Sequence, residues 1–536
     1  MRILVMGGTG GFGSTICRLL ADDGHHVTAA SRRSKGDDFP KRMDHMTIDR
    51  KDVQVPHLAD FDLVVDASGP FQGLGQQLME TAIAAGIHYV DIADDRRFVD
   101  AASLLDPKAR AAGVCVVSGA SSIPALSSAA AFELTRGMDA VHRIDVSISA
   151  GADAVFGPAV LHAMLTGAGR PVRWQGGLSP AAMSSPRDVA VVDPTDGSRV
   201  GRTVLVCDSP DLTTMPSLLP GRPEVRFRAG SELPLHNRAM RIVSWCVRRR
   251  LVGSGTAFSS LASKARRLTA SRASGRSFML IEAIGDVAGG HQRRTWSILA
   301  TNGLGPTIPC LAVPALVAAI DEGRIGTGAC SASGLLTTTE ILSRLPDRDH
   351  HLTTTTEDLH PLYRDVLGNA WDLLPEPVRA MHDRIADGTA TGTADVERGR
   401  GVLAALTCRL IGFPKTGRNV PVKVSFSIED DIETWTRDFA GTRFVSRLRR
   451  VGDLLEERFG PLRFRFRLEG NGEGISMIPA GWWLWRMPLP SAMMPNGVAT
   501  ETCSDGRFRF EVPISMPIVG SVVRYVGNLD QDMRNA

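Results

Sequence analysis

The chain opens with MRILVMGGTGGFGSTICRLLADDGHHVTAASRRSKG, residues 1–36, and this stretch decides the fold of its first part. Ile3–Met6 is a short apolar run of the kind that forms a buried parallel strand. Gly8, Gly10 and Gly13 then fit the pattern GxGxxG, and apolar residues at helical spacing follow. A second strand-like run ends at Ser31. Because strand, glycine turn, helix and strand occur in this order, the stretch predicts a dinucleotide-binding site.

Each glycine of the pattern has a physical task at such a site. The first permits a tight turn, the second lets the backbone approach a pyrophosphate, and the third lets the helix pack closely on the strand. The N-terminus of the helix offers N–H groups and a positive dipole end to the phosphates. The alternative is a glycine-rich turn in an unrelated α/β domain. The cofactor-binding residues predicted in this turn are Gly7, Gly8, Thr9, Gly10, Gly11, Phe12 and Gly13.

The end of the second strand indicates which dinucleotide binds. Sites for NAD usually carry an acidic residue there, which binds the ribose hydroxyls. This chain has Ser31-Arg32-Arg33 instead. A guanidinium can pair with a 2′-phosphate, and no carboxylate at these positions repels one. We therefore expect NADP(H), with Ser31 and Arg32 at the 2′-phosphate, whereas Arg33 could also be a solvated surface charge.

Alternating strand and helix patterns continue through the first 124 residues, which predicts a doubly wound parallel sheet of the Rossmann type. Ligands of such sheets bind beyond the carboxyl ends of the strands. The fourth strand ends before Ser68 and Gly69, which we expect beside the nicotinamide. The next strands end near Asp91 and Asp94 and before Ser122, and these are the candidate acid–base residues. Carboxylates at strand ends are also commonly helix caps.

Four segments in order resemble the saccharopine dehydrogenase-like oxidoreductases: GGTGGFG, DLVVDASGPFQGLG, AGIHYVDIADD and SGASSIPALSS. The resemblance is specific over about the first 130 residues and loose to residue 345. It implies hydride transfer with a nicotinamide cofactor to a polarised C=N or C=C bond. The basic cluster that would bind a dicarboxylic amino acid is not identifiable, so the substrate is expected to be another small or lipid-like molecule. Residues 359–529 resemble a bacterial domain of unknown function that is often fused to such reductases.

A rival within the same fold is the short-chain dehydrogenase class, whose members usually need Tyr-x-x-x-Lys. The three tyrosines of the chain are Tyr89, Tyr363 and Tyr525, and none is followed by lysine four positions later. The sequence therefore argues against this class.

The remaining chain divides into a mixed α/β substrate domain (residues 125–345), a linker (346–358) and a C-terminal α+β domain with an antiparallel sheet (359–536). Helices are expected at 360–385 and 397–411, followed by strands in which apolar and polar residues alternate. Trp482, Trp483 and Trp485 could line the concave side of that sheet and hold an apolar ligand; the alternative is an ordinary packed sheet. The basic segment 240–268 is a candidate for a membrane-surface contact, or a surface helix pair with extended arginines.

The composition of the chain excludes several further classes of function. The net charge of +3 over 536 residues gives no reason to expect nucleic acid. The eight cysteines form neither a CxxC motif nor a disulfide framework, so we expect no metal and a cytoplasmic location. The longest apolar run is too short to span a bilayer, although peripheral membrane contact stays open. The oligomeric state is also open, with a homodimer as one option. We thus expect an NADP(H)-dependent oxidoreductase; the alternative is a non-catalytic NADP-binding scaffold whose C-terminal domain binds a lipid or a partner.

Overall fold

The computed structural model describes residues 1–32, 43–151, 162, 165–174, 180–260, 262, 274–517 and 519–531. The chain forms two compact units, each with a core of its own. Unit 1 comprises residues 1–288 and 292–357, and unit 2 comprises residues 289–291 and 358–536.

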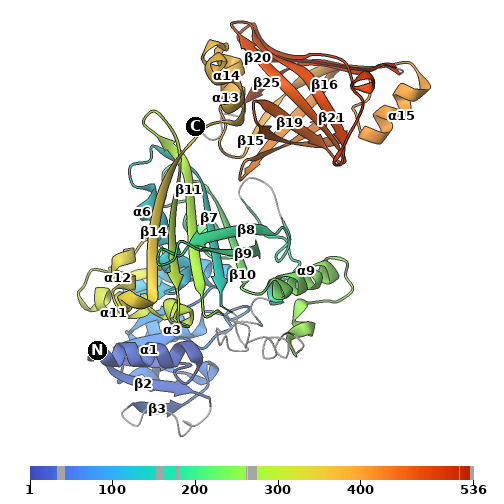
Figure 1. The fold of residues 1–536 in the computed structure, drawn as a ribbon. Coiled ribbons are helices and arrows are strands. Elements are labelled where there is room, and N and C mark those ends of the chain that lie inside the picture. Colours follow the sequence, from blue (N-terminus) through green and yellow to red (C-terminus); the bar gives the residue numbers. More distant parts are fainter. Residues whose placement is uncertain are drawn as a thin grey trace. The chain divides into compact units, whose positions relative to one another are not determined.

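Unit 1 begins with a sheet of seven parallel strands in the order β13-β6-β5-β4-β1-β2-β3. Figure 1 shows β2 and β3 of this sheet next to helix α1 (Gly11–Asp22). The first six strands have the Rossmann order, in which the direction of winding reverses between β1 and β4. This confirms the predicted doubly wound sheet. The strands are β1 (Arg2–Met6), β2 (His26–Ser31), β3 (Asp44–Thr47), β4 (Leu63–Asp66), β5 (His88–Asp91), β6 (Cys115–Ser118) and β13 (Gly328–Ser331).

The seventh strand of this sheet comes from far along the chain. Residues 305–345 return to the first sheet: β13 pairs with β6, and η6 and α11 pack on α1. The module that begins at residue 1 therefore extends beyond the predicted boundary at 124. The helices and helical turns around the sheet are α1 (Gly11–Asp22), η1 (Arg50–Asp52), α2 (Val55–Leu58), α3 (Gln77–Ala85), α4 (Arg96–Ala102), η2 (Ser103–Leu105), α5 (Asp106–Ala111), η3 (Ser122–Leu126), α6 (Ser127–Thr135), η6 (Gly305–Cys310), α11 (Ala312–Asp321) and α12 (Thr338–Leu342).

The second sheet of unit 1 is mixed, as predicted, with the order β14-β12-β11-β7-β10-β9-β8. β7 pairs parallel to β10 and antiparallel to β11. Ile144 and Val146 of β7 belong to the same core cluster as the first sheet, so one apolar core joins the two sheets. A smaller, separate apolar cluster lies on β8, β9, β11 and β12 of the second sheet. The elements are β7 (Ala140–Ala150), β8 (Arg187–Val192), β9 (Arg199–Val206), α8 (Asp211–Thr214), β10 (Glu224–Ser231), α9 (Pro234–Arg248), η4 (Gly255–Phe258), β11 (Ser277–Val287), β12 (Gly290–Ala300), η7 (Asp347–Asp349) and β14 (His350–Leu359).

The linker predicted at 346–358 is wrong. Residues 350–359 form β14, the edge strand of the second sheet beside β12. The segment HHLTTTTEDL is rich in β-branched threonine, which favours a strand. Most side chains of β14 are exposed, so the strand has no buried face that would require alternating apolar residues.

Unit 2 is built around an antiparallel sheet that closes on itself. Its order is β20-β19-β18-β17-β16-β15-β25-β24-β23-β21, and β20 also pairs with β21, so these ten described strands form a ring. The strands are β15 (Gly388–Arg398), β16 (Gly417–Glu429), β17 (Ile432–Phe439), β18 (Thr442–Val451), β19 (Leu454–Phe459), β20 (Leu462–Asn471), β21 (Gly474–Leu484), β22 (Met487–Pro488), β23 (Ala499–Ser504), β24 (Arg507–Met516) and β25 (Gly520–Gln531).

The helical segments of unit 2 differ from the prediction. Instead of one helix at 360–385, the chain forms three pieces, because Pro361 and Pro375 start helices and Gly368 ends one. The helix predicted at 397–411 begins only at Val402, after β15. The pieces are α13 (Leu362–Leu367), η8 (Gly368–Leu373), α14 (Glu376–His382), α15 (Val402–Ile411) and the short η9 (Ser491–Met493).

The three tryptophans near the end of β21 do not gather on one side. Trp482 is buried and stacks on Phe464, whereas Trp483 lies under the guanidinium of Arg465 and Trp485 is 66% exposed. Charged groups also lie in the buried core, where Arg437 pairs with Glu457 at 3.2 Å. The expectation of a concave face lined by these three tryptophans is therefore wrong.

Candidate dinucleotide site and its surroundings

The glycine turn between β1 and α1 leaves no room for side chains. Gly7 has a φ of +74°, and a Cβ there would lie 2.7 Å from the carbonyl oxygen of Ala67 at the end of β4. A Cβ on Gly8 would lie 2.7 Å from that of Ala29 in β2, and one on Gly13 would lie 2.1 Å from the carbonyl oxygen of Gly7. The turn is thus wedged against the strand ends on both sides. This is the cradle that close approach of a pyrophosphate requires.

The first turn of α1 presents its backbone to solvent. Its N-cap residue, Gly10, has no side chain that could cap the helix, and the first turn holds no acidic residue. Thr9, Gly10 and Gly11 are exposed, and Phe12 is half-buried. The first N–H groups of a helix have no partner within it, so this end can bind an anion. The Cys310 thiol, in the segment that returns to this sheet, donates to the carbonyl oxygen of Phe12 at 3.6 Å.

The end of β2 lies next to β1 in the sheet and carries Ser31 and Arg32, as expected. Arg32 is exposed. The Ser31 hydroxyl lies 2.9 Å from the Nε2 atom of His45 on β3, a neighbour that the sequence pattern did not indicate. Arg33 lies outside the described residues.

The end of β4 is organised by Asp66, which the sequence analysis missed. Its buried carboxylate pairs with Arg50 of η1 at 2.7 Å. It also accepts hydrogen bonds from the Ser68 amide at 3.0 Å and the Ser68 hydroxyl at 2.5 Å. Burial alone would lower the pKa of Arg50, but the Asp66 carboxylate raises it overall. Asp66 therefore holds the Ser68-Gly69 loop in place. In the sequence, the feature that could have indicated this role is an aspartate at the end of a buried strand.

Asp91, a candidate acid, is fully buried at the end of β5. Its Oδ1 atom accepts hydrogen bonds from the amides of Ala93 and Gly119, both at 2.9 Å, and from the Ser118 hydroxyl at 3.0 Å. Burial raises its pKa to about 7, although these hydrogen bonds lower it. Asp91 therefore ties the end of β5 to the end of β6, and its side chain is not exposed to solvent.

Asp94 and Ser122, the other two candidates, are more accessible. Asp94 is exposed, and its Oδ1 atom accepts a hydrogen bond from Gln72 at 3.3 Å. Ser122 is half-buried at the start of η3. The sheet order brings the ends of β4, β5 and β6 to one edge, so all predicted site residues of these loops share it.

A second buried acid, Asp211, lies on α8 and was not indicated by any sequence pattern. Its Oδ1 atom accepts a hydrogen bond from Ser127 at 3.0 Å, directly after η3. Burial raises the pKa of Asp211 to about 7. The contact joins α8 to the start of α6.

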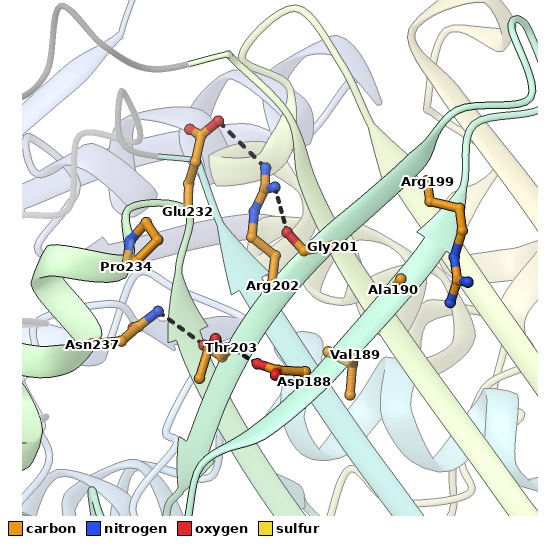
Figure 2. A pocket seen from close by; sticks show the side chains of 10 residues that line it. All are labelled: Asp188, Val189, Ala190, Arg199, Gly201, Arg202, Thr203, Glu232, Pro234 and Asn237. Atoms are coloured by element: carbon orange, nitrogen blue, oxygen red, sulfur yellow. Dashed lines mark hydrogen bonds and ion pairs between the residues drawn. The ribbon is translucent and has the colours of Figure 1, made fainter.

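A cavity of about 410 Å³ lies elsewhere in unit 1 (Figure 2). Its lining comes from β8, β9, the first turns of α9 and Glu232 just before that helix, and includes none of the loops at the glycine turn. Arg202 pairs with Glu232 at 3.3 Å, and Thr203 donates to Asp188 at 2.6 Å. Since these polar groups bind one another, the cavity shows no convergent set of groups for catalysis.

Comparison with known families agrees with this geometry. Residues 3–117 match the saccharopine dehydrogenase NADP binding domain. This part of the chain is therefore a nucleotide-binding domain of that type. Residues 374–529 match a domain of unknown function, DUF4166. Both resemblances noted in the sequence are thereby confirmed, and the cofactor is a nicotinamide dinucleotide.

Comparisons with individual proteins add little. No curated protein matches the chain. Among solved structures, the Lmo0794 protein from Listeria monocytogenes is 20% identical, with 22% of this chain and 78% of that one covered and a TM-score of 0.17. A protein from Klebsiella pneumoniae that is named as an oxidoreductase is 17% identical, with 44% and 63% covered and a TM-score of 0.25. TM-scores this low reflect local matches, and nothing about activity follows from them.

One observation bears on membrane association: within the described part of the chain, no helix is both long and apolar enough to cross a bilayer.

Proposed function

We propose that the protein is an NADP(H)-dependent reductase that acts on a polarised C=N or C=C bond of a small or lipid-like substrate. The observation that carries the proposal is the glycine cradle at the switch point of the sheet, beside a β2 end that holds Ser31 and Arg32. The residues present fit the cofactor, because the turn excludes side chains and the helix end exposes its amides. When bound, NADPH would supply the hydride.

The preference for NADP(H) rests on the end of β2. Arg32 is exposed there, and its guanidinium can form a forked pair with a 2′-phosphate. We expect NADPH to bind at least about tenfold more tightly than NADH, which is about 1.4 kcal/mol. Arg32→Asp should reverse the preference, whereas Arg418→Asp, an exposed arginine in unit 2, should not change it. Equal affinities of the unmodified protein for both cofactors, measured by fluorescence titration, would refute the assignment.

For the proton that accompanies the hydride, we favour Asp94 over Asp91. Addition of a hydride from the bound cofactor to the carbon of the polarised bond would leave an electron pair at nitrogen or at the second carbon, so the protein must supply a proton there. Asp94 is accessible and accepts a hydrogen bond from Gln72, so in its protonated form it can donate this proton and regain one from water. Asp91 is a positioning residue in this scheme, because its carboxylate holds the amides of Ala93 and Gly119.

Single-turnover kinetics test the chemistry. NADPH bound to the protein is mixed with a panel of imines, enones and ketones, and loss of its fluorescence reports hydride transfer. Asp94→Asn should slow turnover by about 10²-fold or more, with NADPH affinity within about threefold. An unchanged rate in this variant clears Asp94 and turns attention to Ser122. If no substrate of the panel oxidises NADPH, the non-catalytic scaffold becomes the better description.

A further inference from the structure

Helix α9 carries an apolar stripe on its solvent-facing side. Leu235 and Ile242 are each 62% exposed and Trp245 is 52% exposed. Their spacing of seven and three residues places them on one face of the helix. Three large apolar side chains exposed on one face of a helix are typical of a surface that something covers.

The opposite side of α9 is anchored to the protein. The buried residues of the helix are Asn237, Val243 and Ser244. Asn237 donates to the carbonyl oxygen of Thr203 at 2.9 Å, and the Ser244 hydroxyl donates to that of Ala182 at 2.8 Å. The helix packs on β9 and β10 and lies beside them in Figure 1. These contacts fix the rotation of the helix, so the apolar stripe stays directed outward.

Arginines flank the stripe, and the segment that carries them contains no acidic residue. Between Leu233 and Ser254 the chain contains no aspartate or glutamate. The arginines of this segment are all exposed: Arg238, Arg241, Arg248, Arg249 and Arg250. Leu251, which follows them, is 63% exposed. The surface thus combines aliphatic and aromatic groups with five positive charges.

We propose that α9 docks the protein on an anionic lipid bilayer. Apolar side chains enter the boundary between headgroups and acyl chains, and the indole of Trp245 suits that boundary. The arginines reach the lipid phosphates and the serine carboxylates, each contributing about fivefold to binding. The arginines match an anionic surface. A second copy of the helix would instead place its own five arginines against the five of the first copy. Nucleic acid would satisfy the arginines but leave Leu235, Ile242 and Trp245 in water.

Vesicle co-sedimentation of the full-length protein tests the docking. We expect binding to phosphatidylcholine vesicles that contain phosphatidylserine at least about tenfold tighter than to pure phosphatidylcholine, and weaker binding at high salt. Ile242→Ser with Trp245→Ser should weaken binding at least about tenfold, and so should Arg248→Glu with Arg249→Glu. A matched control replaces exposed apolar residues of α15, Val402→Ser with Leu406→Ser, and should bind as the unmodified protein does. All variants should keep their NADPH affinity, which shows that unit 1 is folded.

Several results would overturn the proposal. Binding that is indifferent to both α9 variants would place the contact elsewhere. Absence of vesicle binding, together with a dimer in light scattering that the Ile242→Ser and Trp245→Ser variant loses, would assign the stripe to self-association. Tighter binding of a labelled oligonucleotide than of the vesicles, lost in the arginine variant, would assign it to nucleic acid.

Discussion

Gly13 and Gly11 stand two positions apart on the first turn of α1, yet their surroundings differ sharply. The carbonyl oxygen of Gly7 occupies the place where a Gly13 side chain would begin, whereas nothing lies within 4 Å of the equivalent point at Gly11. Gly13 therefore sets how closely the helix approaches the turn. Gly11 belongs to the same glycine-rich run without that constraint.

This difference yields a matched pair of variants. Gly13→Ala must push the start of α1 away from Gly7, because a contact of 2.1 Å cannot persist. We expect its NADPH affinity to fall by about 10²-fold or more, or about 2.7 kcal/mol. Gly11→Ala should stay within about threefold of the unmodified protein. Titration of NADPH fluorescence measures both, and a Gly13→Ala protein that binds normally would show that the turn does not hold the cofactor.

Local pattern was enough to find the glycine turn but not the groups that support it. Gly7–Gly13 are consecutive, so their roles follow from the order of strand, turn and helix. Arg50 lies in η1 and Asp66 lies at the end of β4, which pairs with β1. Their side chains meet only in the folded unit. The pairing of Asp91 with the Gly119 amide likewise depends on which strands are neighbours. Such contacts cannot be derived from spacing along the chain.

Helix α8 places one ionisable group, Asp211, entirely inside unit 1. Its carboxylate accepts one hydrogen bond from Ser127, while its Oδ2 atom has no hydrogen-bond partner among the described residues. Burial without an opposite charge favours the neutral acid, which explains why its pKa rises from 3.8 to about 7. Folding is therefore linked to proton binding at this element.

The sign of this linkage is a loss of stability as the pH rises. The folded state holds the proton of Asp211 more tightly than the unfolded state does. The stabilisation that results is complete below about pH 4 and is lost as the pH passes about 7. Between pH 5 and 8 the unmodified protein should lose about 2–3 kcal/mol through Asp211. Asp211→Asn, which resembles the neutral acid, should lack this part of the pH dependence. Denaturant unfolding at both pH values measures it.

Asp60→Asn serves as the control, because the Asp60 side chain is 94% exposed. Its unfolding should follow that of the unmodified protein at both pH values. An Asp211→Asn protein with the same pH dependence as the unmodified chain would contradict the assignment.

Elements with a strong apolar period were predictable, and those set by distant pairing were not. The strands LRFRFRL and RFRFEVPI alternate clearly and appear in β20 and β24. β14 has no apolar alternation and is defined by its pairing with β12. The four residues of β13 are too few for a periodic signal, and their place beside β6 comes from the return of the chain to the first sheet.

In the whole molecule, units 1 and 2 have separate main cores, which indicates which part of the chain can fold alone. The main apolar core of unit 1 joins both of its sheets, so no break in the packing separates the predicted first and middle domains. Unit 2 has a separate apolar cluster that joins its strands to α13, η8 and α14. Closure pairs every strand of the ring on both sides and leaves no open edge there.

Unit 2 should therefore fold without unit 1. A fragment that begins at Asp358 should unfold cooperatively in denaturant, with a circular dichroism signal typical of antiparallel strands. A fragment that begins at His350 carries β14 without its partner β12 and should be the more aggregation-prone of the two. A disordered Asp358 fragment would show that unit 2 depends on the rest of the chain.

The late arrival of β13 has a consequence for biosynthesis. On the ribosome, β6 emerges long before residues 328–331, which lie about 200 positions further along the chain. At roughly 5–20 residues per second, the nascent sheet waits on the order of 10–40 s for its last strand and for the helices η6 and α11. During that interval the edge of β6 and the apolar flank of α1 have no cover. We expect the nascent chain to be a client of ribosome-associated chaperones until about residue 345 has left the exit tunnel.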